Sequence, residues 1–223
     1  MSGYYADRLS GEMLRKCYEI APPRVQRYLE AELDFVMRRV RPDDLVLELG
    51  CGYGRIFERL ACTAGIVVGV DTAHASLGLG RRLLEGLPNC HFVQMDAATL
   101  AFRDRVFDVV VCIQNGISAF GVDRRRLIEE SLRITRRGGQ VLFSSYSPRF
   151  WNDRLEWFRL QSEHGLLGEI DEQATGDGVI VCKDGFRAAT VGPDEFLMLT
   201  AGLDVRRRIE EVDGSSLFCE ISG

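Results

Sequence analysis

The stretch LVLELGCGYGR, which runs from Leu45 to Arg55, joins a short apolar run to three glycines. Leu45–Leu49 predicts a buried strand, and the glycines at 50, 52 and 54 predict a loop directly after it. The dinucleotide fingerprint is GxGxxG after a first strand, whereas the spacing here is GxGxG and Arg55 occupies the third glycine slot. The loop therefore suits either a nucleotide phosphate or the close approach of a nucleoside that has no phosphate.

Apolar strands alternate with helical patterns on both sides of this loop, which is typical of a parallel sheet covered on both faces. After Tyr146 this rhythm ends, and residues 147–190 read as a helix followed by a glycine-rich segment with a short hairpin. No linker or repeat divides the chain, so we expect a single domain over residues 1–223. The expected strands are 45–49, 66–70, 90–95, 107–113, 140–146, 203–211 and 216–222, and the expected helices are 53–62, 75–86, 124–135, 147–164, 193–201 and one that opens at Pro22-Pro23.

The bulk composition excludes several classes of protein. The chain has 223 residues, of which 46% are hydrophobic and 27% charged, and it has no apolar run long enough to cross a membrane. Its net charge is −5 and its arginines are scattered, which argues against a nucleic-acid partner. Seven cysteines without a CxxC pair indicate reduced thiols and no metal site. We expect a cytoplasmic protein; the oligomeric state does not follow from the sequence.

Three acidic residues each follow an apolar strand. Glu48 ends the first strand, Asp71 the second and Asp96 the third, so all three are expected at the carboxyl edge of one sheet, where open α/β sheets bind ligands. Three carboxylates are a poor cradle for a pyrophosphate. They suit a nucleoside with positive charge and many donors, because Asp71 can accept the ribose hydroxyls, Asp96 an adenine amine and Glu48 an ammonium group. S-adenosylmethionine has all of these groups and a sulfonium.

At this point the sequence resembles the class I S-adenosylmethionine-dependent methyltransferases. ELGCGYG is similar to their first motif, GVD to the second, MDA to the third, FDVVVCIQN to the strand-four motif and LRITRRGGQVLFSSY to the fifth. The resemblance is close over residues 40–146. It implies a Rossmann-like α/β fold: a seven-stranded, mostly parallel sheet with helices on both faces and the last strand antiparallel, between the fifth and the sixth. It also implies that S-adenosylmethionine is bound by the following residues: Glu48, Gly50, Cys51, Gly52, Asp71, Thr72, Asp96, Ala97 and Gln114.

Methyl transfer is an in-line displacement in which the enzyme mainly aligns the acceptor and excludes water. Strand four ends in Gln114-Asn115 rather than in the Asn/Asp-Pro-Pro motif of the amide and base methyltransferases, which favours a small-molecule acceptor. Two accessory segments are expected to hold it, a helical lid within residues 1–40 and the insertion 147–190. Their aromatic and acidic residues suggest a cationic or amine-bearing acceptor. The candidate acceptor residues are Tyr4, Tyr5, Asn115, Tyr146, Trp151, Trp157 and Glu169, with Glu156 and Asp171 as further acids.

Several alternatives remain open at this level. Intact Glu48, Asp71 and Asp96 would also serve a protein that senses the cofactor without turnover. A methyltransferase that acts on a protein or a tRNA is another possibility, and so is an aminopropyl transferase or a nicotinamide oxidoreductase on a related sheet. The sequence does not name a catalytic base, the acceptor or the atom that is methylated.

Overall fold

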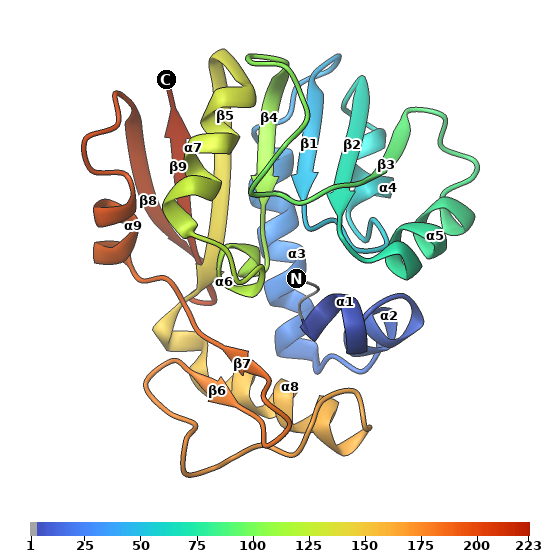
Figure 1. Ribbon diagram of the computed structural model, residues 1–223, viewed down its shortest axis with the longest axis vertical. Coiled ribbons are helices and arrows are strands. Elements are labelled where there is room, and N and C mark those ends of the chain that lie inside the picture. The colour runs from blue at the N-terminus through green and yellow to red at the C-terminus, as the bar shows by residue number, and fades with distance from the viewer. Residues whose placement is uncertain (1–3) are drawn as a thin grey trace.

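The main strands form one seven-stranded sheet in the order β3-β2-β1-β4-β5-β9-β8 in the computed structural model, which describes residues 4–223 (Figure 1). β1 to β5 are parallel to one another, and β9 is antiparallel to both β5 and β8. The predicted fold class, with the last strand inserted between the fifth and the sixth of the main strands, is thereby confirmed. The strands are β1 Leu45–Leu49, β2 Ile66–Asp71, β3 Cys90–Gln94, β4 Phe107–Cys112, β5 Thr135–Tyr146, β8 Arg206–Val212 and β9 Ser216–Ser222.

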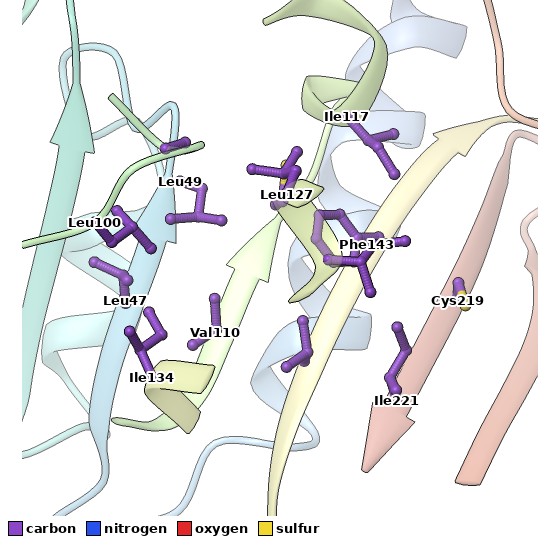
Figure 2. Packing of buried hydrophobic residues seen from close by; sticks show 14 of the residues in the cluster. Leu47, Leu49, Leu100, Val110, Ile117, Leu127, Ile134, Phe143, Cys219 and Ile221 are labelled. Carbon is purple, nitrogen blue, oxygen red and sulfur yellow. The ribbon is translucent and has the colours of Figure 1, made fainter. Parts of the chain in front are cut away.

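Each face of the sheet carries its own hydrophobic core, because alternate strand residues point to opposite sides. On one face Leu47 and Phe143 pack against α7 (Arg124–Ile134) and α9 (Pro193–Leu199), as Figure 2 shows in part. On the other face Val46 packs against α3 (Pro23–Met37), α4 (Phe57–Ala61) and α5 (His74–Leu83). Truncating one such buried side chain costs about 2–5 kcal/mol. The two cores therefore fix the strand ends on which the site is built.

A third hydrophobic core lies beyond the carboxyl ends of β1 and β4 (Figure 1). It joins the roof, which we define as residues 4–19 with α1 (Tyr4–Arg8) and α2 (Glu12–Glu19), to the cap, residues 148–188. The cap elements are η1 Pro148–Phe150, α8 Trp151–Glu163, β6 Ile180–Val181 and β7 Arg187–Ala188, and β6 and β7 pair in the hairpin that the sequence predicts. The roof is shorter than the lid expected over residues 1–40, because α3 packs on the sheet. Residues 1–3 of that segment lie outside the described residues.

Most differences from the expected elements have a local cause. The helix expected over 53–62 begins only at Phe57, because Gly52 and Gly54 adopt left-handed φ values of 55° and 75° that interrupt an α-helix. β5 begins at Thr135 instead of Gln140, with a register shift against β4. α6 (Gly116–Ala119) is a single helical turn, too short to show a periodic pattern of apolar residues in the sequence. None of the helices formed by residues 4–223 has the length and apolarity needed to span a membrane.

Candidate active site

A cavity of about 380 Å³ opens at the carboxyl ends of β1, β2 and β4, under the roof. Its volume lies in the range of small-molecule sites. The structure brings together in its lining every residue that the sequence proposes for the cofactor. These are Glu48, Gly50, Cys51, Gly52, Asp71, Thr72, Asp96, Ala97 and Gln114.

The glycine loop is pinned to the second strand. The backbone N–H groups of Gly50 and Cys51 both donate to the carbonyl of Val70, at 2.8 and 3.0 Å. Gly50 has a φ of 69°, and a Cβ there would lie 2.4 Å from the Phe120 ring. A Cβ at Gly54 would come within 2.7 Å of the Phe92 ring. Gly50 therefore keeps the loop close to the cavity, whereas Gly54 serves packing against β3.

Asp71 ties this loop to the end of β2. Its Oδ2 accepts from the N–H of Gly52 at 2.8 Å, and its Oδ1 accepts from the N–H of Ala73 at 2.7 Å. Burial raises the pKa of Asp71, and these backbone donors oppose the shift. A carboxylate has about four acceptor positions, so the side chain keeps the capacity to accept ligand hydroxyls.

Glu48 is a buried acid whose Oε2 lacks a hydrogen-bond partner among the described residues. Its side chain lies in the cavity lining, the residue is 6% exposed, and Oε2 has no hydrogen bond within residues 4–223. Burial raises the pKa of Glu48 to about 8, Arg55 opposes the shift and Asp71 adds to it. An unpaired buried carboxyl oxygen is costly, so this atom is suited to receive a cationic donor from a ligand.

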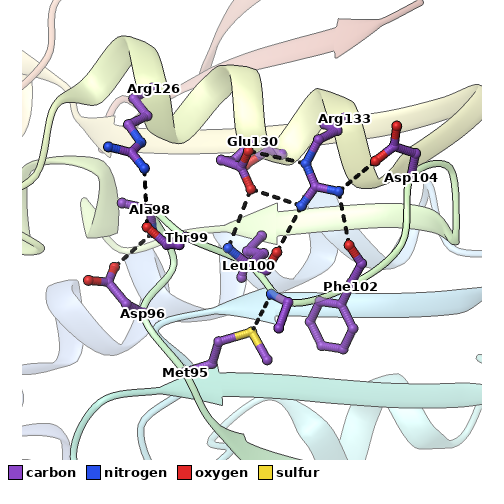
Figure 3. Close-up of polar contacts among 12 residues, drawn as sticks. Met95, Asp96, Ala98, Thr99, Leu100, Phe102, Asp104, Arg126, Glu130 and Arg133 are labelled. Atoms are coloured by element: carbon purple, nitrogen blue, oxygen red, sulfur yellow. Dashed lines mark hydrogen bonds and ion pairs between the residues drawn. The ribbon is translucent and has the colours of Figure 1, made fainter.

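The loop after β3, which carries Asp96 and Ala97, is held from α7 (Figure 3). Arg133 donates to the carbonyls of Leu100 at 2.8 Å and Phe102 at 2.9 Å. The same guanidinium pairs with Glu130 at 2.9 Å and with Asp104 at 2.7 Å. Asp96 itself accepts from the N–H of Ala98 at 2.8 Å and stays exposed. Arg133 therefore sets the position of one wall of the cavity.

Arg55 and Tyr18 line the cavity beside Gln114, and sequence reasoning assigned no role to either. The Gln114 amide fits best with its oxygen 3.0 Å from Arg55 Nε and its nitrogen 2.6 Å from Tyr18 Oη. The Arg55 guanidinium also lies over the Tyr18 ring, 5.2 Å from its centroid. The presence of an arginine in the third glycine slot was the one signal in the sequence. The group links the end of β4 to α2 of the roof.

Gln114 and Asn115 both have positive φ, at 54° and 61°, directly after β4. Two consecutive non-glycine residues in this region are uncommon, and such conformations cluster at functional sites. The N–H of Gln114 donates to the buried Glu32 Oε2 at 3.0 Å. Asn115 instead faces away from the cavity, accepting from Ser145 Oγ and donating to the Ala189 carbonyl, both at 2.8 Å. Asn115 is therefore not among the described residues that line the cavity.

The end of the cavity under the cap is aromatic. Of the expected acceptor residues, Tyr5, Tyr146 and Trp157 line it. Phe158 and Gln161 join them, because they share a face of α8 with Trp157. Trp157 Nε1 also donates to the Cys17 carbonyl at 2.9 Å, which fastens α8 to the roof.

The other expected acceptor residues lie away from the cavity. Tyr4 donates to Asp184 Oδ2 at 2.6 Å, and Trp151 packs on the core between roof and cap. Glu169 is exposed and pairs with Lys183 at 2.5 Å. Glu156 and Asp171 are likewise absent from the lining found among residues 4–223. The structure thus does not bring these acids into the cavity, because they face solvent or stabilise cap turns.

Two further groups of residues bear on the chemistry. Within the part of the chain that the structure describes, no cluster of histidine, cysteine, aspartate and glutamate could hold a metal ion. The cysteines are free thiols, and burial raises the pKa of Cys51 well above its usual value. Cys51 also sits tightly against β2, since a Cβ at Gly69 would lie 2.5 Å from its sulfur. Cys51 therefore fills space under the loop and is unsuited to act as a nucleophile.

Comparison with known proteins agrees with this geometry. Residues 46–139 match the model of a family described as "Methyltransferase domain". Demethylmenaquinone methyltransferase of Clavibacter sepedonicus is 34% identical over 102 residues, which are 46% of this chain and 41% of that protein. The ubiquinone/menaquinone biosynthesis C-methyltransferase UbiE of Vibrio vulnificus (strain YJ016) is 28% identical over 146 residues, 61% of this chain and 54% of that protein. The chain thus spans about half the length of these relatives or less.

Similarity of fold extends over the whole chain. A solved structure from Pyrococcus horikoshii OT3 superposes with a TM-score of 0.71 at 22% identity and covers 100% of this chain and 99% of that one. Residues 46–139 thus match a methyltransferase domain, and the whole chain shares the fold of the solved structure, which supports the resemblance to class I S-adenosylmethionine-dependent methyltransferases that the motifs predict.

Proposed function

We propose that the protein transfers a methyl group from S-adenosylmethionine to a small-molecule acceptor. The observation that carries this proposal is the unpaired Glu48 Oε2 in a cavity that also presents Asp71, Asp96 and the guanidinium of Arg55. These groups match the charged and hydrogen-bonding groups of the cofactor: an ammonium, a ribose diol, an adenine amine and a carboxylate.

The residues present fit this cofactor without rearrangement of the sheet. Glu48 would face the ammonium group, and Arg55 would bind the carboxylate in place of its contact with Gln114. Asp71 would accept from the ribose hydroxyls, while Asp96 and Ala97 would border the adenine. Charged donors and acceptors of this kind contribute roughly 1.5–3 kcal/mol per hydrogen bond, so the set is sufficient for micromolar binding.

The chain's own contribution to the reaction is alignment and exclusion of water. The bound cofactor supplies an electrophilic methyl group on a positively charged sulfur. The roof covers the cavity through Tyr5, Leu9, Leu14 and Tyr18, and the cap closes it with Trp157 and Phe158. The acceptor is thereby held against Gln114 and Tyr146 in a space that has little water.

A small acceptor is favoured because the roof and the cap enclose the reacting end of the cavity. A folded protein or a tRNA would have to displace both. The two relatives named above are called a demethylmenaquinone methyltransferase and a ubiquinone/menaquinone biosynthesis C-methyltransferase, which supports a small acceptor.

Isothermal titration with three ligands tests the cofactor assignment. S-adenosylhomocysteine should bind, and 5′-methylthioadenosine, which lacks the amino-acid part, should bind at least about tenfold more weakly because the contacts to Glu48 and Arg55 are lost. NAD should not bind. Equal affinities for S-adenosylhomocysteine and 5′-methylthioadenosine would refute the contacts proposed for Glu48 and Arg55. Tighter binding of NAD would refute S-adenosylmethionine as the cofactor.

Turnover is tested separately, by following S-adenosylhomocysteine production from S-adenosylmethionine with a panel of small phenols, amines, thiols and carboxylates. Product that depends on one acceptor class supports the enzyme. Cofactor binding without product on any class would favour a sensor that has no turnover.

A further inference from the structure

Arg154 on α8 is a buried cation behind the acceptor end of the cavity. The residue is 1% exposed, and its Nη1 and Nη2 donate to the carbonyls of Gly178 and Ala188, both at 2.9 Å. Its Nε is buried and has no partner within residues 4–223. Over the same residues Arg154 forms no ion pair. Burial lowers the pKa of its guanidinium, and the nearby Tyr146, Tyr5 and Tyr28 oppose this shift. A buried guanidinium stays charged and is costly without a counter-ion, so its presence here calls for an explanation.

The position of this cation relates it to the cavity. Its Cζ lies 4.4 Å from the centroid of the Tyr146 ring and 5.4 Å from that of Phe158. Both rings line the cavity, so the positive charge lies one aromatic ring behind the wall. At this depth its field is weakly screened by solvent and reaches a ligand stacked on those rings.

The lining itself adds no negative charge at this end. The carboxylates that line the cavity lie near the end of β1 (Glu48), at the end of β2 (Asp71) and after β3 (Asp96), and they surround the proposed cofactor. Apart from Arg55, whose guanidinium lies over the Tyr18 ring, the acceptor end consists of neutral side chains, most of them aromatic: Tyr5, Leu9, Tyr18, Tyr146, Trp157, Phe158 and Gln161.

The buried carboxyl of Glu32 lies on the α3 side of this wall. It accepts from Ser216 Oγ at 2.5 Å and from the N–H of Gln114 at 3.0 Å, and burial raises its pKa. Its hydrogen bonds are therefore made within the protein, and it does not line the cavity found among the described residues. Arg154 also has two hydrogen bonds to carbonyls, but among the described residues it has neither a counter-ion nor a partner for its Nε.

We propose, on the basis of the methyltransferase function above, that the acceptor is a hydroxyarene bound as its phenolate, with Arg154 behind Tyr146 stabilising the anion. Flat aromatic walls suit the ring, and the Tyr5, Tyr146 and Gln161 side chains can donate to its oxygen. An amine acceptor would be disfavoured, because its protonated form would meet a positive potential.

The reaction then needs no general base. The phenol loses its proton to water as it binds, and the phenolate uses an electron pair on oxygen, or on a ring carbon beside it, to form the bond to the methyl carbon. The carbon–sulfur bond breaks and its electron pair stays on sulfur, so one negative and one positive charge are both neutralised. Transfer to carbon is completed when the ring proton at that carbon is lost to water.

The probe is 4-nitrophenol, whose ionisation near neutral pH is visible by absorbance, titrated on protein saturated with S-adenosylhomocysteine. We expect the pKa of the bound phenol to fall by about one unit relative to solution, as expected near an opposite charge. In Arg154→Met, which keeps the apolar stem, most of this shift should disappear, and Arg154→Lys should restore part of it. The matched control is Arg159→Met on the same helix, whose exposed guanidinium pairs with Glu172 at 2.8 Å.

Circular dichroism and S-adenosylhomocysteine affinity must first match the wild-type values in each variant. A folded Arg154→Met protein that keeps the full shift would overturn the role of Arg154. If that variant does not fold, the wild-type titration decides: an unchanged or raised pKa, or no binding of 4-nitrophenol at millimolar concentration, overturns the phenolate. Failure of S-adenosylhomocysteine itself to bind would instead overturn the proposed function.

Discussion

At the scale of single residues, the role proposed for Glu48 would link cofactor binding to the protonation of its carboxyl. Burial raises its pKa from 4.5 to about 8, so the ligand-free protein carries a neutral carboxyl at neutral pH. An ammonium group favours the ionised carboxylate, and binding must therefore release the proton. The affinity for the cofactor should therefore rise with pH up to about 8. Above that pH Glu48 is already ionised, so the affinity should level off.

We predict that S-adenosylhomocysteine binding at pH below 8 releases up to one proton, with up to about tenfold stronger binding per pH unit. Isothermal titration in two buffers with different ionisation enthalpies measures the proton directly. Glu48→Gln should bind more weakly near pH 8 and release no proton, whereas Glu58→Gln on the exposed surface of α4 should behave as wild type. An unchanged proton release in Glu48→Gln would contradict this assignment.

The strand-end acids could be placed in one cavity from the sequence because parallel strands bring their carboxyl ends to a single edge. Arg55 and Tyr18 could not be placed in this way. Their positions depend on how α4 and the roof pack against the sheet. No local sequence pattern shows into which space these two side chains point. Asn115 is the opposite case: the sequence predicts it in the pocket, but its left-handed backbone turns its side chain out of the cavity.

At the scale of elements, Arg133 makes α7 a support for the loop after β3, which carries Asp96 (Figure 3). We predict that Arg133→Met lowers the free energy of unfolding by about 2 kcal/mol, because several charge-assisted bonds to the loop are lost. It should also weaken S-adenosylhomocysteine binding severalfold, since the loop with Asp96 is then less ordered before binding. Thermal unfolding and isothermal titration measure the two effects.

The control is Arg126→Met on the same helix, because Arg126 contacts the loop only through a 3.4 Å bond to Thr99 Oγ1. That variant should change neither quantity appreciably. Equal losses in both variants would mean that helix stability, and not the loop contact, is responsible.

Strand positions followed from the sequence to within a few residues, since apolar runs bounded by turns leave little choice of register. Asp213 and Gly214 form the expected tight turn, with φ values of 54° and 62°. The helix after the glycine loop was expected too early, because residue propensities do not show that Gly52 and Gly54 are left-handed. Tertiary contacts also lengthen β5 at its start, where Thr135 pairs with Phe107.

At the scale of the whole molecule, the roof is attached at separate points to parts of the chain far apart in sequence. Tyr4 and Arg8 bind Asp184 in the cap at 2.6 and 3.0 Å. The N–H of Gly11 donates to Ser76 Oγ on α5 at 2.9 Å. Ligands that reach the cavity have to pass this cover, so the attachment to Asp184 should govern how often it opens.

We predict that Asp184→Ala accelerates amide hydrogen exchange over residues 4–19 severalfold and speeds dissociation of S-adenosylhomocysteine, with little change in melting temperature. Exchange followed by mass spectrometry and stopped-flow fluorescence measure these effects. Glu172→Ala, which breaks the exposed pair with Arg159 elsewhere in the cap, is the control and should leave the roof unchanged. Unaltered exchange in Asp184→Ala would show that the other attachments are sufficient.

The roof and the cap were the part of the molecule least accessible from sequence. Their aromatic residues were recognised, but which of them face the cavity depends on the rotation of α8, whose apolar residues do not form a clear stripe. Trp157 turns inward and Trp151 packs elsewhere, although both are large aromatic residues of the same helix.

The insertion of β9 between β5 and β8 has a consequence for synthesis on the ribosome. The chain emerges from its N-terminus, so β5 and β8 are both made before the strand that joins them. Until Ser216–Ser222 emerges, β5 presents an unpaired edge and β8 has no neighbour in the sheet. Open strand edges are templates for association with other chains. Protection of the nascent chain is therefore most needed in the interval before β9 is made.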